Sequence, residues 1–81
     1  MNPNKPVFLH YNIVDCEHEG DVESAENEVE RIISPIGGKV TDSYWDGDDC
    51  GEAWVECKIP YNIDNINKLI NSGDFCNPYQ Y

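Results

Sequence analysis

Apolar residues recur at helical spacing between positions 21 and 36 of the chain. Neighbours three and four residues apart share one face of an α-helix, so this spacing predicts a single apolar stripe that packs on another element. The stripe consists of Val22, Ala25, Val29, Ile32 and Ile33. Asp21 is a suitable N-cap for this helix, and Pro35 followed by Gly37 and Gly38 ends it.

Other segments show the period of two that is typical of a β-strand. They cover residues 7–14, 39–45 and 52–59. In the first of them one face is cleanly apolar and is expected to meet the helix; it consists of Val7, Leu9, Tyr11 and Ile13. A short second helix is expected from residue 63 to 70, ended by Gly73. Residues 1–6 and 74–81 are expected to be irregular or loosely packed, unless the second of these segments adds a short edge strand.

The order strand, helix, strand, strand, helix predicts one α+β domain covering residues 1–81. A right-handed crossover followed by a hairpin begins a ferredoxin-like plait. In that layout the first and second strands are parallel, the third lies between them, and both helices cover one face of the sheet. Simple pairing of the hairpin would put Asp42 on the core face between Val40 and Tyr44. A β-bulge near Asp42 would turn its carboxylate outward.

Charge is the outlying property of this composition. The 81 residues include 16 Asp and Glu against 5 Lys and Arg, a formal net charge of −11. Such a field repels nucleic acid and anionic membranes, and it steers the protein toward basic partners. The competing interpretation is that the charge serves solubility alone.

The predicted layout gathers many of the acids at one end of the sheet and along the outer face of the first helix. We expect Glu23, Glu26 and Glu30 to point into solvent, away from the apolar stripe. This candidate partner-binding surface comprises Asp15, Glu17, Glu19, Asp21, Glu23, Glu26, Glu30, Asp46, Asp48 and Asp49.

The face of the sheet opposite the helices is the second candidate surface. Its aromatic members are expected to be Phe8, His10, Trp45 and Trp54, with Val14, Thr41, Ser43 and Glu56 beside them. Ferredoxin-like RNA-binding modules stack bases on such a face. With so few basic residues to hold phosphates, direct nucleic-acid binding is disfavoured here. A homodimer or a protein partner on this face is the better expectation, unless the tryptophans fold into the rim of the core.

The cysteines and histidines raise the question of a metal. Cys16, His18, Cys50 and Cys76 are expected near one end of the sheet, and these residue types bind zinc. No Cys-x-x-Cys pair is present, so the spacing favours ordinary thiols with no metal and no cofactor. Cys57 alternates with Val55 and Ile59 and is expected in the core. No nucleophile motif or phosphate-binding loop is present, and we expect a protein that is not an enzyme.

The start of the chain lacks the apolar segment of a signal peptide, and no apolar run is long enough for a membrane span. We therefore expect a cytoplasmic protein with reduced thiols. In size and charge it resembles small acidic inhibitors of nucleic-acid enzymes, including phage anti-defence proteins of the anti-CRISPR type. That resemblance implies an inhibitor that mimics nucleic acid and docks on a basic, nucleic-acid-binding surface of its partner. An immunity or antitoxin-type protein and a small metal-binding domain are the alternatives.

Overall fold

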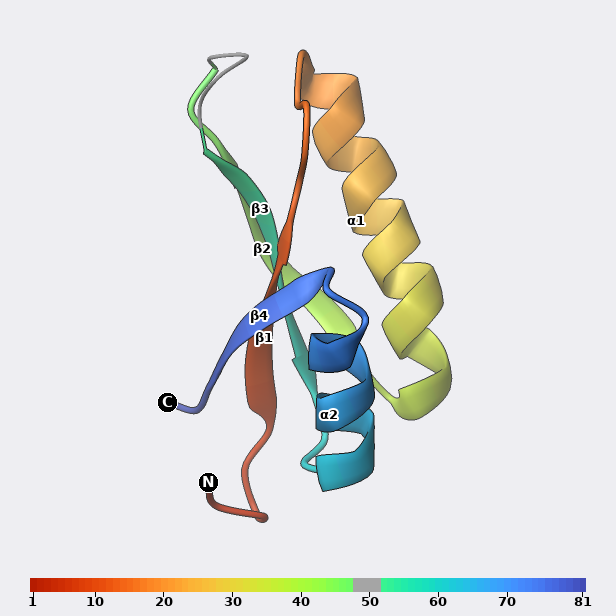
Figure 1. The fold of residues 1–81 in the computed structure, drawn as a ribbon, viewed down its shortest axis with the longest axis vertical. Coiled ribbons are helices and arrows are strands. Elements are labelled where there is room, and N and C mark those ends of the chain that lie inside the picture. Colours follow the sequence, from red (N-terminus) through yellow and green to blue (C-terminus); the bar gives the residue numbers. More distant parts are fainter. Residues whose placement is uncertain (48–51) are drawn as a thin grey trace.

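The fold was analysed in a computed structural model that describes residues 1–47 and 52–81. Four strands form one sheet in the order β2-β3-β1-β4, and every neighbouring pair is antiparallel. The strands are β1 (Val7–Asn12), β2 (Lys39–Trp45), β3 (Ala53–Ile59) and β4 (Phe75–Tyr79). The helices are α1 (Glu19–Ile33) and α2 (Ile63–Asn71), and a 3-10 turn (Ser34–Ile36) follows α1. Both helices lie on the same side of the sheet (Figure 1). This is the predicted α+β fold, and its strand order fits a ferredoxin-like plait loosely.

The core lies between the helices and one face of the sheet. Alternate residues of β3 are buried, and Val55 and Cys57 are 0% exposed. On the neighbouring strand Val7 and Leu9 are equally buried. The helices contribute Ala25, Val29, Ile33, Ile66 and Leu69 to the same cluster. The predicted placement of Cys57 in the core is confirmed, and burial raises the pKa of its thiol to about 12.

The start of α1 differs in detail from the prediction. The N-cap residue is His18, and Asp21 lies in the first turn. One carboxylate oxygen of Asp21 accepts hydrogen bonds from the backbone N–H groups of Glu17 (2.8 Å) and His18 (3.3 Å). Those bonds hold the pKa of Asp21 below its ordinary value, the bond from Glu17 most strongly. Asp21 therefore fastens the start of the helix as the N3 residue of a capping box, and His18 takes the N-cap position that was expected for Asp21.

Strand β2 contains a β-bulge near Asp42, as was predicted from the cost of placing its carboxylate on the core face. Its register with β3 shifts between Val40 and Asp42, so Asp42 pairs with Glu56 and is exposed. The extra residue reverses every later side chain of the strand, because strand faces alternate with a period of two. Trp45 consequently pairs with buried Ala53 and lies on the helix side of the sheet.

Trp45 and Ser43 were expected on the open face, and that prediction is wrong. Tyr44 takes the expected place of Trp45 and stacks on Trp54, with 5.5 Å between ring centroids. Val14 also leaves the open face, because β1 ends at Asn12 and Val14 is 81% exposed in the following loop.

The C-terminal segment is ordered as an edge strand. β4 pairs with β1, and Phe75 is 3% exposed where it packs against the core. The two termini lie close together (Figure 1), and the amide of Gln80 donates to the carbonyls of Asn2 (2.6 Å) and Lys5 (3.1 Å). Of the two alternatives for residues 74–81, the edge strand is correct and the irregular end is not.

Candidate binding surfaces

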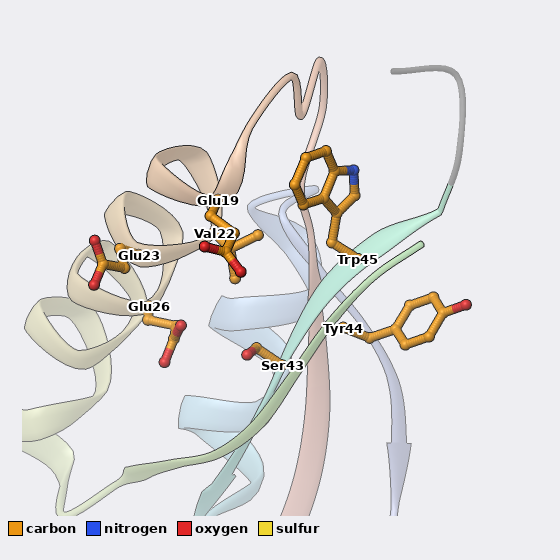
Figure 2. Close-up of a pocket in the computed structure, with 7 residues that line it drawn as sticks. All are labelled: Glu19, Val22, Glu23, Glu26, Ser43, Tyr44 and Trp45. Atoms are coloured by element: carbon orange, nitrogen blue, oxygen red, sulfur yellow. The ribbon is translucent and has the colours of Figure 1, made fainter. Parts of the chain in front are cut away.

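A shallow groove of about 420 Å³ runs between α1 and β2. Figure 2 shows its two walls: Glu19, Glu23 and Glu26 on the helix, and Ser43 and Trp45 on the strand. The carboxylates of Glu19 and Glu26 point into the groove, whereas that of Glu23 points outward from its rim (Figure 2). Val22 lies between them, and Tyr44 lines the rim while its ring points to the other side of the sheet. The β-bulge creates this combination, because it places the Trp45 indole beside the acidic helix. The groove therefore offers negative charge and apolar surface together.

The predicted acids do not all face solvent in the same way. Glu23 and Glu30 are exposed, but Glu26 is half-buried because its side chain faces the groove. The expectation that Glu26 lies wholly on the outer face is therefore wrong. Among the described residues, Arg31 forms the one ion pair of an arginine or lysine with a carboxylate, and its partner is Glu28 (Nη2 to Oε1, 2.5 Å). No described basic side chain pairs with the groove glutamates.

Other predicted acids lie at the end of the sheet where α1 begins (Figure 1). Asp15, Glu17 and Asp46 are exposed there. Asp15 has a φ of 58°, a left-handed conformation that Asp tolerates better than most residues. A carboxylate oxygen of Asp46 accepts a hydrogen bond from the Glu52 N–H (3.1 Å). Asp48, Asp49 and Cys50 lie outside the described residues.

The open face of the sheet carries a continuous aromatic cluster. His10 stacks on Trp54 with 4.5 Å between ring centroids, and Phe8 stacks on Tyr79 at 5.6 Å. Tyr81 packs edge-on against Phe8 at 4.6 Å. Phe8, His10 and Trp54 thus lie where the alternation placed them. The tyrosines were not predicted there, because their positions depend on the bulge and on the C-terminal strand.

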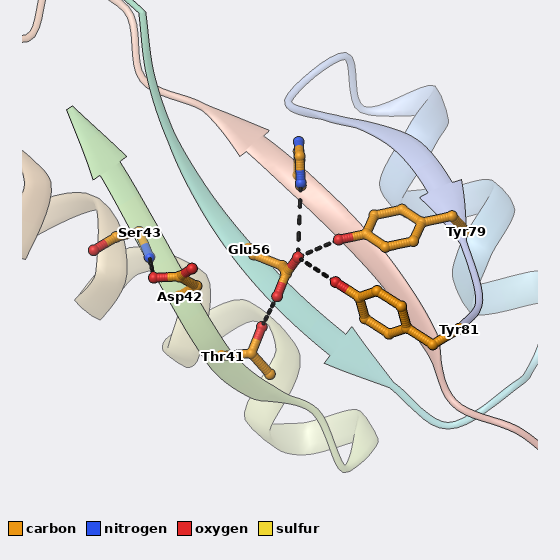
Figure 3. Close-up of polar contacts among 7 residues, drawn as sticks. Thr41, Asp42, Ser43, Glu56, Tyr79 and Tyr81 are labelled. Carbon is orange, nitrogen blue, oxygen red and sulfur yellow. Dashed lines mark hydrogen bonds and ion pairs between the residues drawn. The ribbon is translucent and has the colours of Figure 1, made fainter. Parts of the chain in front are cut away.

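Glu56 lies within this aromatic cluster (Figure 3), and its side chain is 13% exposed. Its carboxylate accepts hydrogen bonds from the hydroxyls of Tyr79, Thr41 (2.7 Å) and Tyr81 (3.4 Å), and His10 Nε2 lies 3.9 Å away. Burial raises the pKa of Glu56, but the Tyr79 and Thr41 hydroxyls, with help from His10, lower that pKa to below its ordinary value. Burial and the carboxylate together raise the pKa of Tyr79.

This network links Glu56 to the pH dependence of folding. A carboxyl group whose pKa is lower in the folded than in the unfolded state stabilises the fold when it is ionised. Its contribution is complete above the unfolded-state pKa and is lost as the pH falls through the folded-state value. Glu56 follows this pattern, because its pKa is lowered in the folded protein. Sequence reasoning treated Glu56 as an ordinary outward residue, since its hydroxyl partners come from distant strands.

The cysteines and histidine that raised the question of a metal do not assemble in the part of the chain that is described. Cys16 is 3% exposed and His18 is exposed, whereas Cys76 lies on β4 and accepts a hydrogen bond from the Asn12 side-chain amide (3.3 Å). Across residues 1–47 and 52–81, no three His, Cys, Asp or Glu side chains form a potential metal-binding group. Within the same residues, neither helix has the length and apolarity that crossing a membrane requires.

Comparison with known proteins adds no functional information. No family model matches the sequence, and neither a curated protein nor a solved structure shows a significant match. Function is therefore inferred from the acidic groove and the open face of the sheet alone.

Proposed function

We propose that this protein is a non-enzymatic binding protein that docks its acidic α1 surface on a basic region of a partner protein. The observation that carries the proposal is the groove, whose lining combines Glu19, Glu23 and Glu26 of α1 with Trp45 of β2. Carboxylates spaced along a helix present a row of negative charge, as a nucleic-acid backbone does. A surface that binds nucleic acid through phosphate contacts is built from Lys and Arg. The partner is accordingly a nucleic-acid-binding enzyme or complex, which this protein would inhibit by occupying that surface.

Physical chemistry favours a partner that contributes arginine. A planar guanidinium binds carboxylates in bidentate geometry and stacks on aromatic rings, which lysine does less well. The groove supplies carboxylates from α1 and an indole from β2. Desolvated contacts of this kind set the dissociation rate, whereas the net charge of −11 accelerates encounter.

The test begins with capture of partners from a lysate of the source cells at low salt. A basic nucleic-acid-binding protein that is released at high salt is the expected result. Binding of that purified protein is then measured for two double variants of equal net charge. Glu23→Gln with Glu26→Gln removes groove carboxylates, and Asp64→Asn with Asp74→Asn removes exposed acids elsewhere.

The groove variant should bind at least about tenfold more weakly, mainly through faster dissociation, because docked charge pairs are worth roughly 1.5 kcal/mol or more each. The control variant should mainly slow association. Equal binding by both variants would show that the acidic surface of α1 does not dock on the partner and serves only solubility. The aromatic cluster of the open face, including its predicted role in a homodimer, would then be the better candidate.

A further inference from the structure

Basic residues are scarce in this chain, yet three of the five gather at one place. Lys5, Lys39 and Lys58 line a second pocket of about 390 Å³ at the end of the sheet where the N-terminus lies. Lys5 comes from the N-terminal segment, Lys39 begins β2, and Lys58 is near the end of β3. None of the described residues that line this pocket is acidic. In a chain with 16 acidic residues, this segregation of positive charge needs an explanation.

The geometry of the lysines is unfavourable without an anion. Lys39 and Lys58 are direct partners across the β2–β3 ladder. Like charges placed opposite one another on neighbouring strands destabilise a sheet. Within the described residues neither lysine has a carboxylate partner, and the Lys5 ammonium donates to the backbone oxygen of Tyr81 (3.2 Å). Among the described residues, therefore, no carboxylate side chain lies within ion-pair distance of Lys39 or Lys58.

The walls of the pocket are ordered and partly apolar. Pro60 and Tyr61 form one side, and Gly37 approaches Pro60 so closely that a Cβ on the glycine would lie 3.3 Å from the proline ring. On the other side the N-terminal turn is held by Gln80, whose side-chain oxygen accepts a hydrogen bond from the Asn2 N–H (2.6 Å). The volume is within the range of pockets that hold small molecules.

We propose that this pocket, which we call the lysine pocket, binds a small ligand that carries a phosphate group on a flat or apolar moiety, as a nucleotide does. The three ammonium groups would hold the phosphate as point charges. The proline and tyrosine side chains would contact the ring. The lysine pocket is separate from the acidic groove, so this proposal does not depend on the proposed docking function.

Binding is tested with adenosine monophosphate, inorganic phosphate and adenosine as probes of the intact chain at low ionic strength. Amide chemical shifts and calorimetry should show that adenosine monophosphate binds more tightly than phosphate and that adenosine does not bind. The shifted amides should include those of Gly37, Lys39 and Tyr61. A monophosphate that binds no better than phosphate, or shifts confined to other residues, would overturn the proposal.

Variants of equal charge separate a specific site from general attraction to lysine. Lys39→Gln and Lys58→Gln should each weaken binding of the monophosphate at least about tenfold, the loss expected for one hydrogen-bonded charge. Lys68→Gln, on the exposed part of α2, should change it by less than about twofold. Amide spectra of the free variants verify that each is folded. An equal loss in all variants would show that net charge, and no built site, governs the binding.

Discussion

Glu56, on β3, contacts side chains from the other three strands of the sheet. Thr41 reaches it from β2, His10 from β1 and Tyr79 from β4. A half-buried carboxylate is costly unless hydrogen bonds replace its lost hydration. Here the hydroxyl groups supply those bonds, and the same bonds fasten β4 to a sheet whose edge it forms.

The hydroxyl of Tyr79 should therefore contribute measurably to stability. Tyr79→Phe should lower the free energy of unfolding by roughly 1.5–3 kcal/mol, the range for a hydrogen bond to a charged group. Tyr81→Phe is the matched control, because the Tyr81 hydroxyl lies 3.4 Å from the carboxylate and the residue is 76% exposed. That change should cost less than about 1 kcal/mol. Denaturant unfolding of both variants measures the difference. Equal losses of unfolding free energy would show that the Tyr79 hydroxyl stabilises the fold no more than the Tyr81 hydroxyl does.

At the scale of elements, periodicity was sufficient to locate both helices and the first three strands. It was insufficient to assign the residues that follow the β-bulge in β2 to the correct face of the sheet. The bulge near Asp42 was predicted from the cost of burying a carboxylate, but its consequence for Trp45 follows only when the register is known. A shift of one residue exchanges the two faces of a strand. That is why the groove and the position of Tyr44 on the open face could not be predicted from sequence, while Tyr79 and Tyr81 reach that face only through the pairing of β4 with β1.

Helix α1 offers a direct test of the packing that the structure assigns. Ile33 is fully buried, while Ile32 is only partly buried against the same core. Ile33→Ala should cost about 2–5 kcal/mol of unfolding free energy, because it leaves a cavity in close-packed surroundings. Ile32→Ala should cost less, since part of that side chain already contacts solvent. Thermal or denaturant unfolding of the pair checks the register of α1, and a larger loss for Ile32→Ala would contradict it.

At the scale of the whole molecule, opposite charges are separated in space. The groove glutamates, Glu19, Glu23 and Glu26, lie in the N-terminal half of α1, and the lysine pocket lies at the opposite end of the sheet, near the termini (Figure 1). The net charge was evident from composition, but this separation was not. Lys5, Lys39 and Lys58 come from separate segments and meet only through the strand order. A molecule with two unlike surfaces can engage two unlike ligands, which is what the proposals above require.

The cost of the acidic surface to folding can be measured with two substitutions that each remove one negative charge. Glu23 is four residues after Glu19 and three before Glu26, and like charges at these helical spacings repel. Glu23→Gln should therefore raise stability by a few tenths of a kcal/mol at low salt. Asp64 lies in the first turn of α2 and four residues before Lys68, so Asp64→Asn should lower stability by a similar amount.

Both effects should largely disappear at about 0.5 M salt, where exposed charges are screened over a few ångströms. Changes of the same sign in the two variants would mean that total charge, and not its placement, controls stability. Stability changes of opposite sign in the two variants would show that the charge of Glu23 destabilises the fold at its position in α1. A glutamate retained at a position where it destabilises the helix is expected of a surface selected for binding, whereas solubility alone could be served by a carboxylate at any exposed site.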